Sequence, residues 1–416
     1  MQNDASSARL ALTSAPWVLL SSRVRKMGVD LKESYDVVVV GAGPGGCYAA
    51  IQLARAGLEV LLLDRAQEIG VPKETGEGLS KGAVERLKLK LPSYCIAQEI
   101  RKARVYAPNG NYVDVRGEGY IVEMKRFVKW LACEAASAGA KVLAKSSVYD
   151  VLKEGGKVCG VRFIHLGKDF EVRASAVVAA DGVESRVAKM AGLDTTLNPA
   201  LVDSGIQYEL AGIELEDPHR LEIFLGNKIA PRGYVWIFPK GANVANVGVG
   251  IGGNHSQATA KYYLDEFIAR YDGLRKGSIV EVNAGCIPVG GFLKNMVLDG
   301  LVVIGDAAHQ VNPLHGGGIA EAMTAGKIAA EVLAKAKELD DFSKEVLAEY
   351  NKRWWKERGN KLRMVEKARE LVEKLSDEQL NKLAEVLKGE DIEEIVHGNI
   401  LKLARVLVKF GLAKLK

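Results

Sequence analysis

Glycines near residue 40 form the first candidate site. Gly41, Gly43 and Gly46 are spaced as G-x-G-x-x-G, and Gly45 is a further glycine inside the motif. The first glycine of such a motif permits a tight turn, the second lets a pyrophosphate approach the backbone, and the third allows close packing of helix on strand. The helix that follows presents unpaired N–H groups and a positive dipole end to phosphate. The spacing therefore predicts a dinucleotide site.

Asp64 strengthens this prediction. It follows an apolar run and stands 23 residues after Gly41, where a carboxylate can accept hydrogen bonds from ribose hydroxyls. Residues 248–253 match the same glycine pattern, but they follow alternating residues and lack a second strand that ends in an acid. We therefore predict one dinucleotide site and interpret the glycines at 248–253 as sheet residues.

Two further segments combine a strand end with an acid and glycine. Asp306 follows the apolar run 301–304, and a glycine triplet that ends at Gly318 precedes a helix predicted from Ile319. Asp181 lies in the sequence ADGVESR.

Such motifs need a parallel sheet to position them. The apolar run 36–40 is typical of a strand buried on both faces. A helix predicted over 45–57 joins it to a second strand at 59–64, which makes a βαβ unit. Residues 103–122 and 203–291 alternate apolar and polar positions, which predicts antiparallel sheet.

The order of the three motifs resembles that of flavoproteins with the p-hydroxybenzoate hydroxylase type of fold. In that group the acid of the second motif binds the ribityl chain of FAD, and the DG motif supports the fold around the pyrophosphate. The resemblance implies these roles for Asp306 and Asp181. It also implies that Gly76 and Gly78 approach the isoalloxazine ring. We therefore predict FAD as the cofactor.

Three segments narrow the resemblance to the geranylgeranyl reductase family: EGLSKG at 77–82, YVWIFPK at 234–240 and ANVG at 245–248. They look most like archaeal digeranylgeranylglycerophospholipid reductases, which saturate the isoprenoid chains of membrane lipids. The resemblance implies an FAD-dependent reductase with an isoprenoid ether-lipid substrate. It leaves the electron donor open between reduced ferredoxin and NAD(P)H.

Tyr234, Trp236 and Phe238 share one face of a strand by alternation. They can form an aromatic stripe in the core or the wall of a cavity beside the flavin, and the family resemblance favours the wall. Protonation of an isolated trisubstituted alkene would give a tertiary cation, which aromatic faces can stabilise. We predict these three as the catalytic residues.

This sequence departs from the family pattern at two positions. The family motif CGEG has a cysteine where this chain has Thr75, and the family's arginine near the cofactor is Met124 here. Both positions, together with Val148, complete the predicted set of cofactor-binding residues. His309 and His315 lie inside the second motif, where cofactor contact and loop packing remain open alternatives.

Other functions remain open or are excluded. A flavin monooxygenase of the same fold, acting on an aromatic or quinone substrate, is the alternative enzyme, and a flavin-bearing module without catalysis is a further one. The net charge of +5 is spread along the chain without a nucleic-acid-binding motif, so we expect no nucleic-acid partner. Five separated cysteines without a CxxC pair indicate a reduced protein without a metal site.

The two ends of the chain carry separate expectations. Residues 1–34 do not have the pattern of a folded domain: they are a transit-like extension or lie upstream of the true start, which Met27 favours. Residues 395–416 contain no acid, and their basic residues recur at helical spacing. This predicts a helix that lies on an anionic membrane or packs on the protein's own core. The lipid substrate favours the membrane.

We therefore predict an α/β protein with a Rossmann-type FAD-binding domain, an antiparallel-sheet substrate domain and a helical C-terminal region. The predicted location is the cytoplasm, peripheral at the inner face of the membrane. The predicted division is 1–34 as an extension, 35–102, 123–202 and 292–340 as a discontinuous FAD-binding domain, 103–122 and 203–291 as the substrate domain, and 341–416 as the C-terminal region.

Overall fold

The computed structural model describes residues 31–73, 75–253 and 257–409. The chain divides into two units, Met1–Glu33 and Ser34–Lys416, and the fold below is that of the second unit. The expectation for residues 1–34 lies almost wholly outside the described residues, as does the end of the predicted terminal helix beyond residue 409.

The first sheet has the strand order β15-β16-β9-β1-β2-β6, and the pairs β16–β9, β9–β1, β1–β2 and β2–β6 are parallel. Its central residues are almost wholly buried, as the apolar runs predict. The strands are β1 (Ser34–Val40), β2 (Val60–Leu63), β6 (Lys141–Leu143), β9 (Lys168–Ala179), β15 (Val297–Leu298) and β16 (Leu301–Val303). The strands β7 (Ser146–Glu154) and β8 (Lys157–His165) extend it antiparallel from β9.

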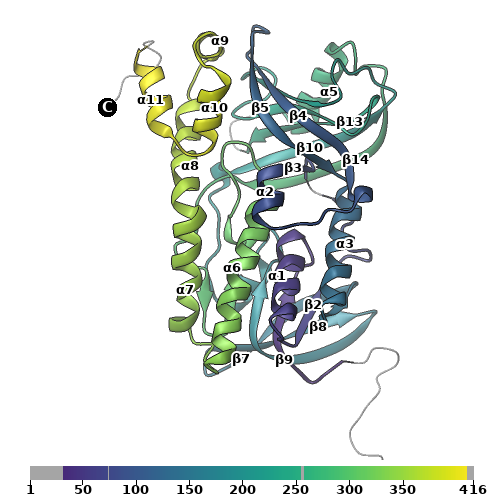
Figure 1. Ribbon diagram of the computed structural model, residues 1–416, viewed down its shortest axis with the longest axis vertical. Helices are drawn as coiled ribbons and strands as arrows, with labels where there is room; N and C mark the ends of the chain where they lie inside the picture. The colour runs from purple at the N-terminus through teal and green to yellow at the C-terminus, as the bar shows by residue number, and fades with distance from the viewer. Residues whose placement is uncertain (1–30, 74, 254–256, 410–416) are drawn as a thin grey trace, which may run out of the picture. The chain divides into compact units, whose positions relative to one another are not determined.

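Helices α1 (Pro44–Arg55), α3 (Met124–Ser137) and α6 (Ile319–Glu338) lie beside one another along the first sheet (Figure 1). Helices α1 and α6 approach closely because glycine stands at their contact. A Cβ at Gly45 would lie 3.0 Å from the Cβ of Ala322, and a Cβ at Gly326 would lie 2.6 Å from the carbonyl oxygen of Gly45. The two helices that open at glycine motifs are thus packed directly together.

The second sheet has the order β14-β10-β13-β12-β11-β4-β5-β3. All its pairs are antiparallel except β11–β4. The prediction of antiparallel sheet is confirmed for most of the two alternating segments, but β4 begins before residue 103, and Ala260–Arg270 form a helix, α5, instead. Helix α5 (Ala260–Arg270) covers one face with a buried apolar cluster. The strands are β3 (Gly78–Ser80), β4 (Ile96–Tyr106), β5 (Tyr112–Val122), β10 (Val202–Ala211), β11 (Arg220–Leu225), β12 (Tyr234–Pro239), β13 (Val244–Gly252) and β14 (Ser278–Pro288). Short helices α2 (Lys81–Arg86) and α4 (Arg186–Ala191) follow β3 and β9.

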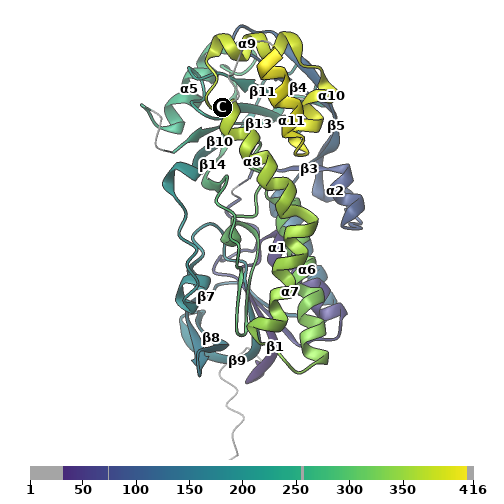
Figure 2. The ribbon, with the colours of Figure 1, turned by 90° about the vertical axis from the view of Figure 1, so that its left-hand side faces the viewer.

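The helical C-terminal region follows α6. Helices α7 (Lys344–Trp354) and α8 (Asn360–Val372) are joined by a π-helical turn over Trp355–Gly359, and α8 leads towards the second sheet (Figure 2). Helices α9 (Asp377–Val386), α10 (Gly389–Val396) and α11 (Ile400–Lys409) complete it. Helix α10 packs on β5: a Cβ at Gly389 would lie 2.2 Å from the carbonyl oxygen of Asp114.

Helix α11 buries part of its apolar face within the protein. Leu403 and Leu407 are each 1% exposed in a cluster shared with α8, α9 and α10, whereas Leu401 and Val408 are exposed. Lys402 forms ion pairs with Asp391 at 2.7 Å and Glu394 at 3.6 Å. In the described residues the helix therefore packs on the protein's own core and leaves a narrower apolar strip outside.

Candidate active site

The first glycine motif has the geometry that a pyrophosphate site needs. Gly41 adopts φ +101°, and a Cβ there would lie 2.3 Å from the carbonyl oxygen of Ala180. A Cβ at Gly46 would lie 1.9 Å from the carbonyl oxygen of Gly41. Gly43 has open space where a side chain would stand, and it precedes α1 without a side-chain cap or an acid in the first turn. The helix N-terminus is therefore accessible to an anion.

Asp64 fixes this turn from the end of β2. One carboxylate oxygen accepts the N–H of Ala42 at 2.7 Å, and the other accepts the N–H of Ala66 at 2.8 Å. Each oxygen has a further lone pair, so the carboxylate can still accept bonds from ribose hydroxyls. The same residue thus holds the glycine turn and offers the predicted cofactor contact.

The DG motif and the second acid motif are joined. Ser185, with no exposed surface and φ +47°, donates a hydrogen bond to the carbonyl oxygen of Ala307 at 3.0 Å. Asp181 accepts the N–H of Val187 through one oxygen at 2.9 Å. Its other oxygen is buried without a hydrogen-bond partner among the described residues. Burial raises the pKa of Asp181, against backbone hydrogen bonds that lower it.

Asp306 lies beside the start of α6: a Cβ at Gly318 would stand 3.1 Å from one carboxylate oxygen. Glycine at the helix start thus leaves room for the acid. His309 is 1% exposed, and its ring nitrogens face the carbonyl oxygens of Gly291 at 2.7 Å and Thr195 at 3.2 Å. This supports the loop-packing interpretation of His309.

These features fit the FAD that the sequence predicts. The site offers two glycine-started helices packed together, open space at Gly43 and Gly182, and an unpaired buried oxygen on Asp181. The fit is to a ligand with a phosphate group and hydroxyl donors, which FAD has.

The aromatic side chains of β12 lie on one face of the second sheet. Each of them begins a row of directly paired residues on the neighbouring strands. Directly paired residues of antiparallel strands share a face. The rows, read across β12, β13, β10 and β14, are Tyr234–Gly250–Gly205–Gly285, Trp236–Gly248–Gln207–Asn283 and Phe238–Asn246–Glu209–Glu281. The face therefore changes from glycine to amide to charged groups along the strands.

Gly248 belongs to β13, which confirms the interpretation of residues 248–253 as sheet glycines. A Cβ there would lie 2.3 Å from the indole ring of Trp236, so glycine makes room for this ring on the sheet. The ring centroids of Tyr234 and Phe238 lie 5.8 and 6.2 Å from that of Trp236.

The loop at residues 75–78 lies against these rings. A Cβ at Gly76 would lie 3.1 Å from the ring of Phe238 and 3.8 Å from the indole nitrogen of Trp236. A Cβ at Gly78 would lie 3.9 Å from the ring of Phe238. The structure thus brings together the loop and the aromatic residues that the sequence singled out separately.

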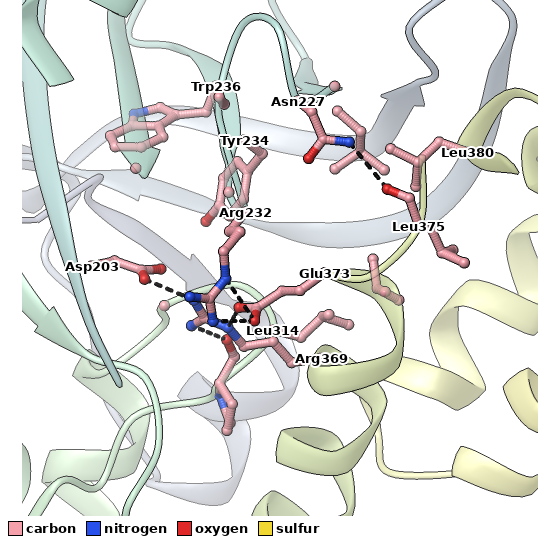
Figure 3. Close-up of a pocket in the computed structure, with 18 of the residues that line it drawn as sticks. Asp203, Asn227, Arg232, Tyr234, Trp236, Leu314, Arg369, Glu373, Leu375 and Leu380 are labelled. Carbon is pink, nitrogen blue, oxygen red and sulfur yellow. Dashed lines mark hydrogen bonds and ion pairs between the residues drawn. The ribbon is translucent and has the colours of Figure 1, made fainter. Parts of the chain in front are cut away.

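A pocket opens at the Tyr234 end of the stripe (Figure 3). Trp236 and Leu314 line it together with Val372 of α8, Leu380 of α9, and Leu375 between these two helices. Its volume of about 80 Å³ is well below the ~300 Å³ of a small ligand pocket. The Tyr234 hydroxyl donates to the carbonyl oxygen of His315 at 2.6 Å, which joins the stripe to the second motif.

Charged side chains close one side of this pocket. Arg369 of α8 donates to Asp203 of β10 at 2.7 Å and also pairs with Glu373. Glu373 in turn pairs with Arg232 at 2.5 Å (Figure 3). Burial raises the pKa of Asp203 to about 6, and Arg369 opposes the rise. These ion pairs attach the C-terminal helices to the second sheet.

Two of the predicted cofactor-binding residues do not place a side chain at the aromatic stripe. Met124 contributes a backbone hydrogen bond to the loop, and Val148 lies on β7 of the first sheet. Met124 is 6% exposed at the start of α3, and its N–H donates to Glu77 at 2.8 Å. Of its basic neighbours, Lys125 pairs with Glu281 at 2.7 Å. Val148 is buried on β7, opposite Phe163 of β8. Their contacts to a cofactor remain predictions.

The sequence analysis does not assign a role to Glu77, Gln207, Lys240 or Asp203. Glu77 and Lys240 stand inside the motifs EGLSKG and YVWIFPK, which could have drawn attention to them. No local pattern marks Gln207 or Asp203.

Within the described ranges, no helix is long and apolar enough to cross a membrane. No cluster of three or more metal-ligating side chains occurs in the same part of the chain.

Comparison with known proteins decides the family. A family model of the geranylgeranyl reductase catalytic domain matches residues 202–287, one of FAD-dependent oxidoreductases matches 36–201, and one of lycopene cyclase proteins matches 254–389. Digeranylgeranylglycerophospholipid reductase 2 of Methanopyrus kandleri is 41% identical over 90% of this chain and 96% of its own length. The chain belongs to the digeranylgeranylglycerophospholipid reductase family. The corresponding reductase of Methanocaldococcus jannaschii is also 41% identical, over 88% of this chain and 93% of its own length.

Solved structures agree with this membership. A geranylgeranyl bacteriochlorophyll reductase-like protein from Thermoplasma acidophilum superposes with a TM-score of 0.86 at 37% identity, covering 91% of this chain and 99% of that one. A flavin-dependent brominase has a TM-score of 0.71 at 18% identity, covering 88% and 94%, which shows a common fold alone. The predicted α/β flavoprotein fold and the family resemblance are confirmed.

Proposed function

We propose that this family member is an FAD-dependent reductase that saturates the prenyl double bonds of archaeal ether-lipid precursors. The observation that carries the proposal is the packing of the loop at Gly76 and Gly78 against Trp236 and Phe238. The family resemblance implies that this loop approaches the isoalloxazine ring, so the aromatic faces would border the place where an alkene reacts.

The predicted cofactor-binding residues would hold FAD, which when bound and reduced would supply hydride. Saturation of one double bond adds a proton to one carbon and a hydride to the other. Trp236 and Phe238 present ring faces that stabilise positive charge on the protonated alkene. Trp236 is 8% exposed, and its burial would help to keep water from that carbon.

Thr75 has a structural role in place of the family's thiol. Its hydroxyl oxygen accepts the N–H of Glu77 at 3.2 Å, which supports the turn. A thiolate is not available at this position, so proton transfer in this protein does not use one.

Oxygen consumption tests the proposal against the monooxygenase alternative. We expect prenyl reduction to proceed anaerobically with a chemical reductant. When oxygen is present, we expect no oxygen consumption beyond that caused by free reduced flavin. Oxygen uptake coupled to hydroxylation of an aromatic or quinone substrate would instead support the monooxygenase. For the physiological electron donor we propose reduced ferredoxin or NAD(P)H, because the sequence offers a single dinucleotide fingerprint. Rates measured with each donor in turn distinguish them.

We also propose peripheral contact with an anionic membrane on the cytoplasmic side, through the outer surface of α11. Leu401, Arg405 and Val408 are exposed there. Apolar burial and cationic side chains together give reversible attachment, with about 1 kcal/mol for each basic residue near an anionic surface. A variant with Leu401, Arg405 and Val408 changed to Ser should remain folded and sediment less with anionic liposomes than the original chain. Unchanged sedimentation would exclude this surface.

A further inference from the structure

We propose that Glu77 is a positioning residue of the reductase. With Lys73 and Lys240 it holds the loop at residues 75–78 against Trp236 and Phe238. It thereby sets the width of the slot between this loop and the two rings, where the alkene would enter. This inference rests on the proposed function, whereas the contacts that support it are independent of substrate.

Glu77 joins four parts of the fold. Its side chain has no exposed surface, and its backbone has φ +70°, which a non-glycine residue adopts only at a cost. One carboxylate oxygen accepts the N–H of Met124 at 2.8 Å. The other accepts the side-chain amide of Asn246 at 2.5 Å and lies 3.1 Å from Lys73 and 3.0 Å from Lys240. The loop, α3, β13 and the end of β12 thus meet at one carboxylate.

The two lysines extend this connection across the sheet. Their side chains are 1% and 3% exposed, and both contact Glu209 of β10, Lys73 at 2.9 Å and Lys240 at 2.8 Å. Lys240 also lies 2.9 Å from Glu123. Burial alone would lower the pKa of Lys240, but Glu77, Glu209 and Glu123 raise it, so the lysine stays charged. The loop is therefore attached to the same row of the sheet that contains Phe238.

Gln207 provides a second attachment between the loop and the aromatic stripe. Its side-chain oxygen accepts the indole N–H of Trp236 at 2.9 Å, and its NH₂ group donates to the carbonyl oxygen of Thr75 at 3.4 Å. The indole can only donate and the carbonyl can only accept, so the orientation of the amide is determined. One side chain thus couples the tilt of the Trp236 ring to the position of the loop.

The ion pairs of Glu77 hold the loop close to the ring of Phe238, and Gly76 permits this close approach because it has no side chain. Because a Cβ at Gly76 would lie only 3.1 Å from Phe238, the backbone is at van der Waals contact with the ring. Loss of the carboxylate charge removes the attraction between the loop and the two lysines, which keep Glu209 as their shared partner. We expect the loop then to move away from the rings and the slot to widen.

A matched control separates this role from stability in general. Glu222 on β11 is 5% exposed and lies 2.6 Å from the buried Arg220. It is in register with Ile237, on the opposite face of the sheet from Trp236 and Phe238. Glu222→Gln therefore removes a buried, ion-paired carboxylate from the same sheet without touching the loop.

The test compares Glu77→Gln with Glu222→Gln in the FAD-loaded protein without substrate. We expect amide hydrogen exchange in residues 75–80 to become about ten-fold faster or more in Glu77→Gln and to stay unchanged in Glu222→Gln. In turnover with a prenyl lipid, kcat should fall in Glu77→Gln with FAD occupancy retained. A folded Glu77→Gln protein with unchanged exchange in this segment would overturn the proposal.

Two further variants keep the test decisive if Glu77→Gln does not fold. Glu77→Gln combined with Lys73→Met removes one charge of each sign, and Gln207→Leu cuts the indole attachment without altering any charge. Faster exchange at 75–80 in either supports the positioning role, and normal exchange in both overturns it. If the unaltered protein reduces no prenyl lipid while the exchange results hold, the proposed function fails and the positioning role stands.

Discussion

Asp64, Asp181 and Asp306 each follow a strand of the first sheet, namely β2, β9 and β16, and these strands run parallel. Their carboxyl ends therefore meet at one edge, together with Gly41 at the end of β1. This explains why acids that are far apart in sequence can serve one cofactor. The predicted cofactor site is therefore built from residues that follow the ends of parallel strands.

Asp306→Ala should weaken FAD binding. Removal of a charged hydrogen-bond acceptor costs roughly 1.5–3 kcal/mol, which is about ten- to a hundred-fold in Kd. Titration of the apoprotein with FAD, followed by flavin fluorescence, measures the change. Asp272→Ala, at an exposed position, serves as the control. Unchanged affinity in Asp306→Ala would remove Asp306 from the cofactor site.

Gly248→Ala should impair prenyl reduction by displacing Trp236, since the added methyl group would overlap the indole ring. We expect kcat to fall by about ten-fold or more with FAD still bound, a loss of roughly 1.4 kcal/mol of transition-state stabilisation. Gly241→Ala, which meets nothing within 4 Å, is the control. Equal rates in the two variants would favour the interpretation of the aromatic residues as a core stripe.

Asp203 predicts a pH dependence of stability. Burial raises its pKa from 3.8 to about 6, so the folded state binds a proton more readily than the unfolded state. The free energy of unfolding, relative to Asp203→Asn, should therefore decrease as the pH rises from about 4 to 6 and stay level above that. The full decrease is about 3 kcal/mol at most, at 1.36 kcal/mol per pKa unit. Urea unfolding of both proteins across this range measures it, and an increase with pH would contradict the assignment.

At the scale of elements, local patterns predicted strands and helices well. The runs at 36–40 and 301–304 became buried parallel strands because both faces are covered. The strands within 203–291 are antiparallel because only alternate residues meet the core beneath α5, which this segment also contains. The ion pair of Asp203 with Arg369 spans 166 residues of sequence, and no periodicity indicates such a contact.

Helix α11 illustrates why the remaining part was difficult. Its sequence fits a membrane surface and a protein core equally, because both bury an apolar face. What distinguishes them is the complementary cluster on α8, α9 and α10, which only the assembled helices provide.

Leu403→Ala tests the packing of this helix. It should lower the free energy of unfolding by about 2–5 kcal/mol, because it leaves a cavity in a buried cluster. Leu401→Ala, at a side chain with 63% exposure, should change it by about 0.5 kcal/mol or less. Comparable effects in chemical denaturation would mean that α11 does not pack as described.

At the scale of the whole second unit, the chain passes between the two sheets at the site. It leaves the first sheet at β2, forms the loop at 75–78, and joins the second sheet as β3, where the N–H of Val122 donates to the carbonyl oxygen of Glu77 at 2.9 Å. The sequence motif of the loop predicts contact with the cofactor, and its observed contacts are with the aromatic residues of β12. The motifs were predictable singly, and their meeting at this loop required the structure.

Mass spectrometry of lipid products tests most directly whether this protein saturates prenyl double bonds. The purified protein, loaded with FAD, is incubated without oxygen with dithionite and a digeranylgeranyl glycerophospholipid. We expect product masses that increase by one hydrogen molecule for each double bond saturated, and about ten-fold less of these products or lower from Gly248→Ala at matched times. Unchanged substrate with the flavin bound and reduced, or products that carry added oxygen under aerobic conditions, would contradict the assignment as a prenyl reductase.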